Sequence, residues 1–368
     1  MLKSYFYNSS KIFQKESDRI YSKHWLFFGL TQEYVEDDSY IRKRMYQYDF
    51  FVTKSGDTYR AFYNICPHRF SPIVNKDAGK THLTCPYHAW SFKEDGKIKS
   101  IPYEKDCYQF NSFKRSSLGL ESIHIKKIGS LLFINFAKNA LPFDRQFKKK
   151  LIDDLHSISN TFTEFKKITL TKRCNWKLIQ ENLRDGLHPI FLHKNTILKR
   201  IKFGLPGIAK NIPYFLLRLK DASFGGPDVD LIESFALKNK FENPWPCESR
   251  YYNYFLFPNL HLALPDGGYT FVLENFIPIS QDETRIELYL IATKSLLSSK
   301  ERDDFFESLE MNAMKVYEED FKIFEDIQLA IKQKKVFQSH HGRYENMLQR
   351  FHKIYLNVLG RFNFFDPL

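Results

Sequence analysis

Four residues with metal-binding side chains form two short pairs in the first quarter of the chain. The first pair is Cys66 with His68, and the second is Cys85 with His88. Zinc fingers usually group Cys with Cys and His with His, whereas here each pair holds one residue of each type. A [2Fe–2S] cluster with two thiolates on one iron and two imidazoles on the other suits this arrangement. The spacing therefore predicts such a cluster, with a structural zinc site as the alternative.

A second group of candidate ligands lies near the middle of the chain. If residues 176–188 form a helix, Asp185 and His188 fall together on the face opposite its apolar residues. Pro189 cannot continue that helix, and the break there brings His193 close to His188. The pattern indicates two histidine ligands beside a carboxylate. A solvated helix face is the alternative interpretation.

The third candidate ligand is Asp320, on a long helix that we expect at about 299–334. Helical spacing places Asp320 inside an apolar arc that consists of Ala313, Tyr317, Phe324, Ile327 and Ile331. The opposite side carries Lys315, Glu319, Lys322 and Asp326. A buried carboxylate is costly unless it is paired or binds a metal. Two His and one carboxylate with open positions form the facial triad of non-haem Fe(II) oxygenases. His188, His193 and Asp320 therefore predict a mononuclear iron site, with a locally hydrogen-bonded Asp320 as the alternative.

These candidate ligands must be positioned by two different kinds of structure. From about Ser39 to Asn135, short apolar or alternating runs predict an all-β region, with the cluster loops between strands. Later strands are expected at about 250–258, 269–278 and 284–293. The irregular segment 200–247 is either a lid or mouth of the site or a plain surface loop.

Three further polar residues have two interpretations each. His261 alternates on a predicted strand, where it either faces a substrate or is a satisfied core residue. Glu181 and Asn182 either support the iron ligands or are exposed on the surface.

Both groups of ligands resemble the motifs of the Rieske oxygenases. The cluster residues stand within Cys66-Pro67-His68-Arg69 and Cys85-Pro86-Tyr87-His88-Ala89-Trp90. The iron ligands stand within Asn175-Trp176-Lys177, Glu181-Asn182, Asp185-x2-His188-x4-His193 and Glu319-Asp320-x4-Glu325-x2-Gln328. Gly129-x3-Phe133-Ile134-Asn135 and Phe257-Pro258-Asn259-Leu260 extend the resemblance over nearly the whole chain. Departures are Phe70 and Ala89, where Gly is usual, and Leu187, where Tyr is common. They bring the packing near the cluster into question.

The resemblance implies an α+β protein with an N-terminal all-β Rieske [2Fe–2S] domain followed by a helix-grip (START-like) catalytic domain. We expect a helical segment at 1–24, the Rieske domain at 25–137, a linker at 138–150 and the catalytic mononuclear-iron domain at 151–368. The implied cofactors are the Rieske cluster and one mononuclear Fe(II).

The resemblance also implies a terminal oxygenase that uses O2 to hydroxylate or oxidatively demethylate an aromatic or small amphiphilic substrate. Asp185 is the implied electron bridge between an iron-ligating His and a cluster His of the next subunit, so we expect a homotrimer. No Gly-rich dinucleotide fingerprint follows a strand. Electrons from NAD(P)H are therefore expected to arrive through a separate reductase and/or ferredoxin. The alternative is a Rieske electron carrier whose C-terminal domain only binds a ligand.

The net charge of +12 raises the question of nucleic acid, but the lysines are scattered in short runs without interleaved aromatics. We expect no nucleic-acid partner. The charge serves either to steer an acidic redox partner or only to solvate the surface. No apolar run has the length of a membrane span and no signal peptide is evident, so we expect no membrane partner. Cys107, Cys174 and Cys247 are expected to be reduced, buried thiols of a cytoplasmic protein.

Overall fold

The computed structural model describes the chain except for residues 197–237, 243–251, 266–267, 334–335, 343–344 and 361–368. It contains two compact units. One unit, here called the catalytic unit, combines Met1–Ile20 with Ser157–Leu368, and the other, the cluster unit, comprises Tyr21–His156. The catalytic unit is thus discontinuous in sequence. The expected combination of an all-β unit with a mixed helix-and-sheet unit is confirmed.

The cluster unit is built on a seven-stranded antiparallel sheet with the order β1-β9-β8-β4-β3-β2-β5. Its strands are β1 (Leu26–Leu30), β2 (Ser39–Met45), β3 (Tyr48–Ser55), β4 (Thr58–Tyr63), β5 (Ala78–Lys80), β8 (Ser122–Ile128) and β9 (Leu131–Asn135), with β6 (Ser91–Phe92) and β7 (Ile98–Ser100) as a separate hairpin. The remaining elements are η3 (Thr31–Glu33), η4 (Glu104–Tyr108), α2 (Ser112–Ser116), α3 (Phe143–Gln146) and α4 (Lys149–Ser159), the last of which continues into the catalytic unit.

The apolar runs of the cluster unit explain where its core lies. All five residues of β1 and all five of β9 are buried, as expected for strands that are apolar on both faces. A second buried cluster of mainly apolar residues surrounds the two predicted ligand cysteines and includes Phe51, Phe62, Leu83, Trp90, Phe92 and Ile98. The thiols therefore lie in a dry environment.

The catalytic unit contains a five-stranded antiparallel sheet with the order β10-β14-β13-β12-β11. Its strands are β10 (Glu164–Lys172), β11 (Tyr252–Leu256), β12 (Leu260–Leu264), β13 (Thr270–Ser280) and β14 (Glu283–Ala292). The helices among its described residues are η1 (Ser4–Tyr7), α1 (Ser10–Glu16), η2 (Ser17–Tyr21, whose last residue belongs to the cluster unit), α5 (Trp176–Asn182), α6 (His188–Leu192), α10 (Ser299–Ile331) and α11 (Asn346–Leu359). The three later strands expected from the sequence are confirmed, whereas β10 and α11 were not predicted.

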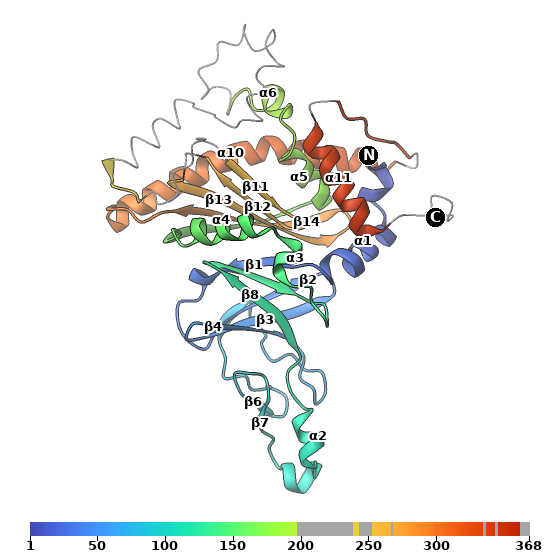
Figure 1. Ribbon diagram of the computed structural model, residues 1–368, viewed down its shortest axis with the longest axis vertical. Helices are drawn as coiled ribbons and strands as arrows, with labels where there is room; N and C mark the ends of the chain where they lie inside the picture. The colour runs from blue at the N-terminus through green and yellow to red at the C-terminus, as the bar shows by residue number, and fades with distance from the viewer. Residues whose placement is uncertain (197–237, 243–251, 266–267, 334–335, 343–344, 361–368) are drawn as a thin grey trace. The chain divides into compact units, whose positions relative to one another are not determined.

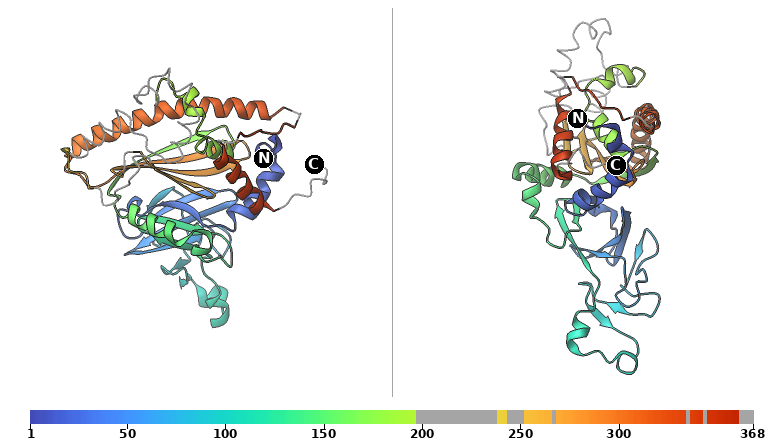
Figure 2. Two further views of the ribbon diagram at one scale, coloured as in Figure 1. Left: turned by 45° about the horizontal axis from the view of Figure 1, so that its top comes forward. Right: turned by 90° about the vertical axis from the view of Figure 1, so that its right-hand side faces the viewer.

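Helix α10 lies along one face of this sheet (Figures 1 and 2). It begins at a capping box in which Ser298 Oγ accepts from the Glu301 N–H and the Glu301 carboxylate accepts from the Ser298 N–H. Asp320 is 7% exposed, so its predicted burial is confirmed. The prediction for Ile327 is wrong, because it is 38% exposed while Gln328 is buried. Over this long helix the buried stripe is displaced from the ideal projection.

The predicted C-terminal boundary of the helix at 176–188 is also wrong, because α5 ends at Asn182. The Asp185 carboxylate accepts hydrogen bonds from the N–H groups of Leu187 (2.7 Å) and His188 (3.3 Å). Such side chain–backbone bonds compete with the helical hydrogen-bond ladder. Pro189 then occupies the first turn of α6, a position that suits proline. The break therefore precedes His188.

The remaining sequence expectations have mixed outcomes. Cys174 is buried as expected, and burial raises the pKa of its thiol to about 12. The expectation for Cys107 is wrong: it is exposed, because it lies on η4 at the surface of the cluster unit. Cys247 and most of the segment 200–247 lie outside the described residues. Among the helices that the structure describes, none combines the length and hydropathy needed to cross a bilayer.

Candidate metal centres

The four predicted cluster residues lie on two loops that flank one strand. Cys66 and His68 are in the loop between β4 and β5, and Cys85 and His88 are in the loop between β5 and β6. Each loop contains the same backbone turn: the Phe70 N–H donates to Cys66 O (2.9 Å), and the Ala89 N–H donates to Cys85 O (3.0 Å). The two cysteines therefore begin equivalent turns, in which His68 is the third residue and His88 the fourth.

In both turns the residue that stands where the Rieske motif usually has glycine adopts a backbone conformation that favours glycine. Phe70 and Ala89 have φ angles of 62° and 57°, in the left-handed region. A residue with a Cβ pays about 1–2 kcal/mol for that conformation, whereas glycine does not. Phe70 is also 80% exposed, so its ring adds no packing to offset the strain.

The side chains of the four residues fit a Rieske cluster. Cys66 and Cys85 are buried within one cluster of packed residues. The rings of His68 and His88 lie 4.6 Å apart. Both Nδ1 atoms are buried and lack a hydrogen-bond partner among the described residues. Because buried polar atoms are normally paired, two orphaned imidazole nitrogens with two thiols match the donor set of this cluster.

Burial acts in opposite directions on the metal-binding forms of the two kinds of ligand. Burial raises the pKa of the Cys66 thiol to about 11, with a smaller contribution from Cys85, so a thiolate there needs a nearby positive charge such as iron. Burial also lowers the pKa of His68, which favours the neutral imidazole. Trp90 stacks on the His68 ring at 4.6 Å, and the Tyr108 hydroxyl lies 3.4 Å from His68 Nε2. These contacts orient the ring.

The structure brings the three predicted mononuclear-iron ligands together. His188 is the first residue of α6, His193 follows the end of α6, and Asp320 lies on α10. One ligand atom from each residue lies within 4.8 Å of the others. Asp320 Oδ1 is 3.3 Å from His193 Nε2 and 3.8 Å from His188 Nε2. Two imidazoles and a carboxylate at this spacing fit a mononuclear Fe(II) site.

The second nitrogen of each histidine also has the contact that a metal site requires. His188 Nδ1 is 2.9 Å from Asp185 O, and His193 Nδ1 is 2.7 Å from Glu319 Oε2. Such contacts fix the ring orientation and leave Nε2 for the metal. Although burial opposes it, the hydrogen bonds of His193 with Asp320 and Glu319 raise the pKa of its imidazole. A proton and a metal therefore compete for this residue.

Asn182 at the end of α5 connects two of the three ligands. Its Nδ2 donates to Asp320 Oδ1 (3.1 Å) and lies 3.2 Å from His188 Nε2. The sequence left Asn182 as either a support or a surface residue, and the contacts favour the support. The Asp185 carboxylate lies 3.6 Å from His188 Nδ1, beside the ligand it was expected to contact.

Several neighbours of the site differ from the sequence predictions. Glu319 was expected on the solvent side of α10, but its carboxylate also accepts from Thr196 Oγ1 (2.7 Å) and belongs to the site. Its place directly before Asp320 was the available signal. Glu181 is not simply exposed, because it accepts hydrogen bonds from Tyr7 and His352. His261 is a satisfied core residue, 3% exposed, between Glu274 and Asn253.

Comparison with protein families agrees with this geometry. The family model described as ring hydroxylating alpha subunit (catalytic domain) matches residues 159–361, more than half of the chain. This chain belongs to that family. The model of the Rieske [2Fe-2S] domain matches residues 24–114. The two matches imply a Rieske cluster and a mononuclear iron as the cofactors of the chain.

Individual relatives add detail. The carnitine monooxygenase oxygenase subunit of Acinetobacter baumannii is 30% identical over 188 residues, which is 50% of each chain. The glycine betaine monooxygenase oxygenase subunit of Chromohalobacter salexigens is 28% identical over 197 residues, 51% of this chain and 43% of the relative. The chain thus spans about half the length of the curated relatives it matches.

Solved structures show the same fold over nearly the whole chain. A quaternary ammonium Rieske monooxygenase in complex with L-carnitine has a TM-score of 0.71 at 19% identity, over 97% of this chain and 95% of the other. Naphthalene 1,2-dioxygenase with indole in its active site also has a TM-score of 0.71, at 18% identity, over 97% and 91%. At these identities the likeness establishes the fold.

Proposed function

We propose that this chain is the terminal oxygenase component of a Rieske oxygenase system. The observation that carries the proposal is the convergence of His188, His193 and Asp320 within 4.8 Å, in a chain that also contains the cluster residues. When bound, the cluster supplies single electrons and the Fe(II) supplies O2 activation. The role of the three side chains is to hold the iron from one side, so that positions remain for O2 and substrate.

The residues around the triad have positioning roles in this proposal. Glu319 and the Asp185 carbonyl hold the two imidazoles, and Asn182 holds Asp320. The Asp185 carboxylate is the proposed electron bridge to a cluster histidine of a neighbouring subunit. A solved quaternary ammonium Rieske monooxygenase of the same fold is described in terms of inter-subunit electron transfer. This likeness supports electron transfer from Cys66, His68, Cys85 and His88 of one subunit to the iron of the next, and the homotrimer stays a prediction.

The proposed substrate is a quaternary ammonium compound, and the proposed reaction is a monooxygenation. The curated relatives with carnitine and glycine betaine in their names support this choice. An aromatic substrate is the second candidate, supported by the matching 2,4-dinitrotoluene dioxygenase component. Electrons come from NAD(P)H through a separate reductase and/or ferredoxin, and the cytoplasmic location stays a prediction. A pure electron carrier is not favoured, because it has no use for Asp320 beside two histidines.

Metal analysis of the purified protein tests the proposal. An oxygenase contains about three irons per chain, two in the cluster and one at the triad, whereas a carrier contains about two. Asp320→Ala should reduce the content to about two and keep the visible spectrum of the cluster. Asp326→Ala, on the exposed side of the same helix, is the matched control. Loss of cluster and mononuclear iron together in the Asp320 variant contradicts the assignment.

Turnover is measured as substrate-stimulated O2 uptake with a surrogate reductase. L-carnitine, glycine betaine, naphthalene and indole form the first panel. A three-iron protein that consumes no O2 with any quaternary ammonium compound, but does so with an aromatic one, moves the proposal to the second substrate class.

A further inference from the structure

Arg184 is a buried cation with no carboxylate partner among the described residues. It lies between α5 and α6, directly before Asp185, and is only 9% exposed. No ion pair joins it to a described carboxylate; burial lowers the pKa of its guanidinium group, and the charge of Glu181 opposes this effect. The Glu181 carboxylate already accepts from Tyr7 and His352. A buried charge without a counterion is strongly unfavourable.

The guanidinium group is held in a fixed orientation. Its carbon lies 4.2 Å from the ring centroid of Phe255 on β11 and 4.6 Å from that of Phe351 on α11. Nη1 donates to Gln180 O (2.6 Å) and to Gln180 Oε1 (2.5 Å). The N–H groups of Nε and Nη2 have no hydrogen-bond acceptor among the described residues. The guanidinium group is therefore held in place by its neighbours, and its Nε–Nη2 edge has no acceptor in the described part of the chain.

A second buried donor belongs to Gln180, the residue that accepts from Arg184 Nη1. Gln180 is 1% exposed, and its Nε2 is buried without a hydrogen-bond partner in the described part of the chain. The same side chain already uses its oxygen to accept from Arg184. Native proteins rarely leave such a donor unpaired. Among the described residues, Arg184 and Gln180 therefore both have buried N–H donors without an acceptor. A negatively charged acceptor would satisfy both side chains.

We propose that Arg184 and Gln180 form a binding site for the carboxylate of the substrate. A planar carboxylate matches the fork of the guanidinium edge and accepts from Gln180 Nε2 with a remaining lone pair. Gln180 lies in the last turn of α5, and Arg184 lies on the segment that leads from α5 to the iron ligand His188. This inference rests on the proposed function and narrows its substrate class to quaternary ammonium compounds that also carry a carboxylate. Carnitine and glycine betaine both do.

The test compares each carboxylate with its methyl ester, which removes the charge and keeps the rest of the molecule. Binding of L-carnitine, glycine betaine and benzoate, and of their methyl esters, is measured by calorimetry on the iron-loaded protein. We expect at least one acid to bind about tenfold more tightly than its ester, as one good charge-assisted contact provides. Arg184→Gln should remove this preference, and Arg184→Lys should retain part of it, because it keeps the charge but loses the fork.

The variant Gln180→Glu distinguishes loss of the binding site from a general failure to fold. It places a carboxylate on Arg184 from within the chain, so the variant should melt at a higher temperature and show no preference for acid over ester. Gln349→Glu, on an exposed position of α11, adds the same charge elsewhere and is the matched control. The inference is wrong if every ester binds as tightly as its acid, if no acid binds, or if Gln180→Glu keeps the preference.

The binding result also separates this inference from the proposed function. Acid-selective binding without substrate-stimulated O2 uptake supports the carboxylate site and counts against the oxygenase. Uptake with naphthalene and no acid selectivity supports the oxygenase and overturns the carboxylate site.

Discussion

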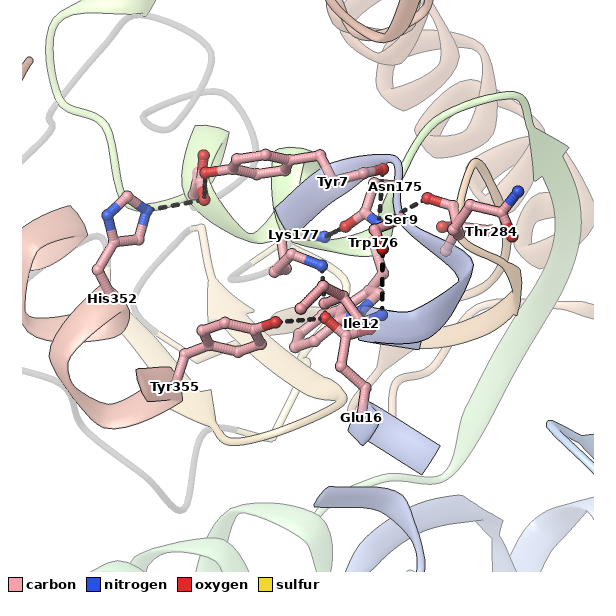
Figure 3. A network of polar contacts seen from close by, with 12 residues as sticks. Tyr7, Ser9, Ile12, Glu16, Asn175, Trp176, Lys177, Thr284, His352 and Tyr355 are labelled. Atoms are coloured by element: carbon pink, nitrogen blue, oxygen red, sulfur yellow. Dashed lines mark hydrogen bonds and ion pairs between the residues drawn. The ribbon is translucent and has the colours of Figure 1, made fainter. Parts of the chain in front are cut away.

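Replacing Glu16 by Gln leaves a fully buried ammonium group without its counterion. The Glu16 carboxylate accepts from Lys177 Nζ (2.6 Å), Trp176 Nε1 (3.0 Å) and the Tyr355 hydroxyl (2.6 Å), as Figure 3 shows. The side chains of Glu16 and Lys177 are both 0% exposed. This pair joins α1 to α5, the helix that ends at Asn182 beside the iron ligands. We expect the substitution to destabilise the catalytic unit strongly.

The expected cost can be worked out from the contacts. Removing one partner of a buried ion pair costs about 3–5 kcal/mol. The rings of Tyr7, Trp176 and Tyr355 lie 5.2–5.4 Å from Lys177 Nζ and keep part of its stabilisation. Cation–π contacts of this kind are worth about 0.5–2 kcal/mol in total here. Gln also still accepts from one of the two neutral donors. We therefore expect a loss near the lower limit, about 3 kcal/mol.

The assay is urea unfolding followed by far-UV circular dichroism, read as the shift of the midpoint at constant slope. The pH dependence gives a second check. Burial lowers the pKa of Lys177, and Glu16 opposes this effect. Without Glu16 the pKa in the folded protein falls further, so the unfolded chain binds more protons and stability rises with pH below about 10.4. The difference between wild type and variant should therefore be smaller at about pH 9 than at about pH 7.

Two further variants decide whether the reasoning holds. In Glu16→Gln/Lys177→Met the buried charge is absent, so most of the lost stability should return. Glu242→Gln breaks the exposed pair with Lys294, whose side chains are 60% and 69% exposed, and should cost less than about 1 kcal/mol. A cost below about 1 kcal/mol for Glu16→Gln, or a double variant as unstable as the single one, refutes the assigned role of the pair.

Three other predictions concern the metal centres. Asp185→Asn should retain both metals but slow substrate-stimulated O2 uptake on the order of 100-fold, because the bridge is disturbed; unchanged turnover contradicts this role. Glu319→Gln removes the negative partner of His193 and should weaken iron binding about 10–100-fold in a chelator competition, whereas the exposed neighbour variant Glu318→Gln should not. Ala89→Gly should raise the unfolding free energy of the cluster unit by up to about 1 kcal/mol, because the left-handed φ of 57° then costs nothing; a lower thermal midpoint of the cluster-loaded protein contradicts the strain.

The sequence predicted features that depend on local spacing. His188 and His193 stand five residues apart across a proline, so the chain itself brings them together, and Asp320 stands out as a carboxylate among apolar residues. The end of α5 was not predicted, because hydrophobic periodicity carries no information on the hydrogen bonds by which the Asp185 carboxylate competes with the helix. Strand β10 was missed because most of its residues are only half-buried and several are charged. Glu16 pairs with Lys177 from 161 residues away, and no periodic pattern encodes such a distance.

The interruption of the catalytic unit by residues 21–156 has a consequence for its synthesis. During synthesis the ribosome releases Glu16 before the cluster unit, Lys177 only after the whole cluster unit, and Tyr355 later still. The cluster unit can thus fold before Glu16 meets Lys177 and Tyr355. A fragment that starts at Ser157 contains Lys177 and Tyr355 but lacks Glu16. We expect this fragment to aggregate when it is expressed alone, and we expect a peptide of residues 1–20 to prevent the aggregation.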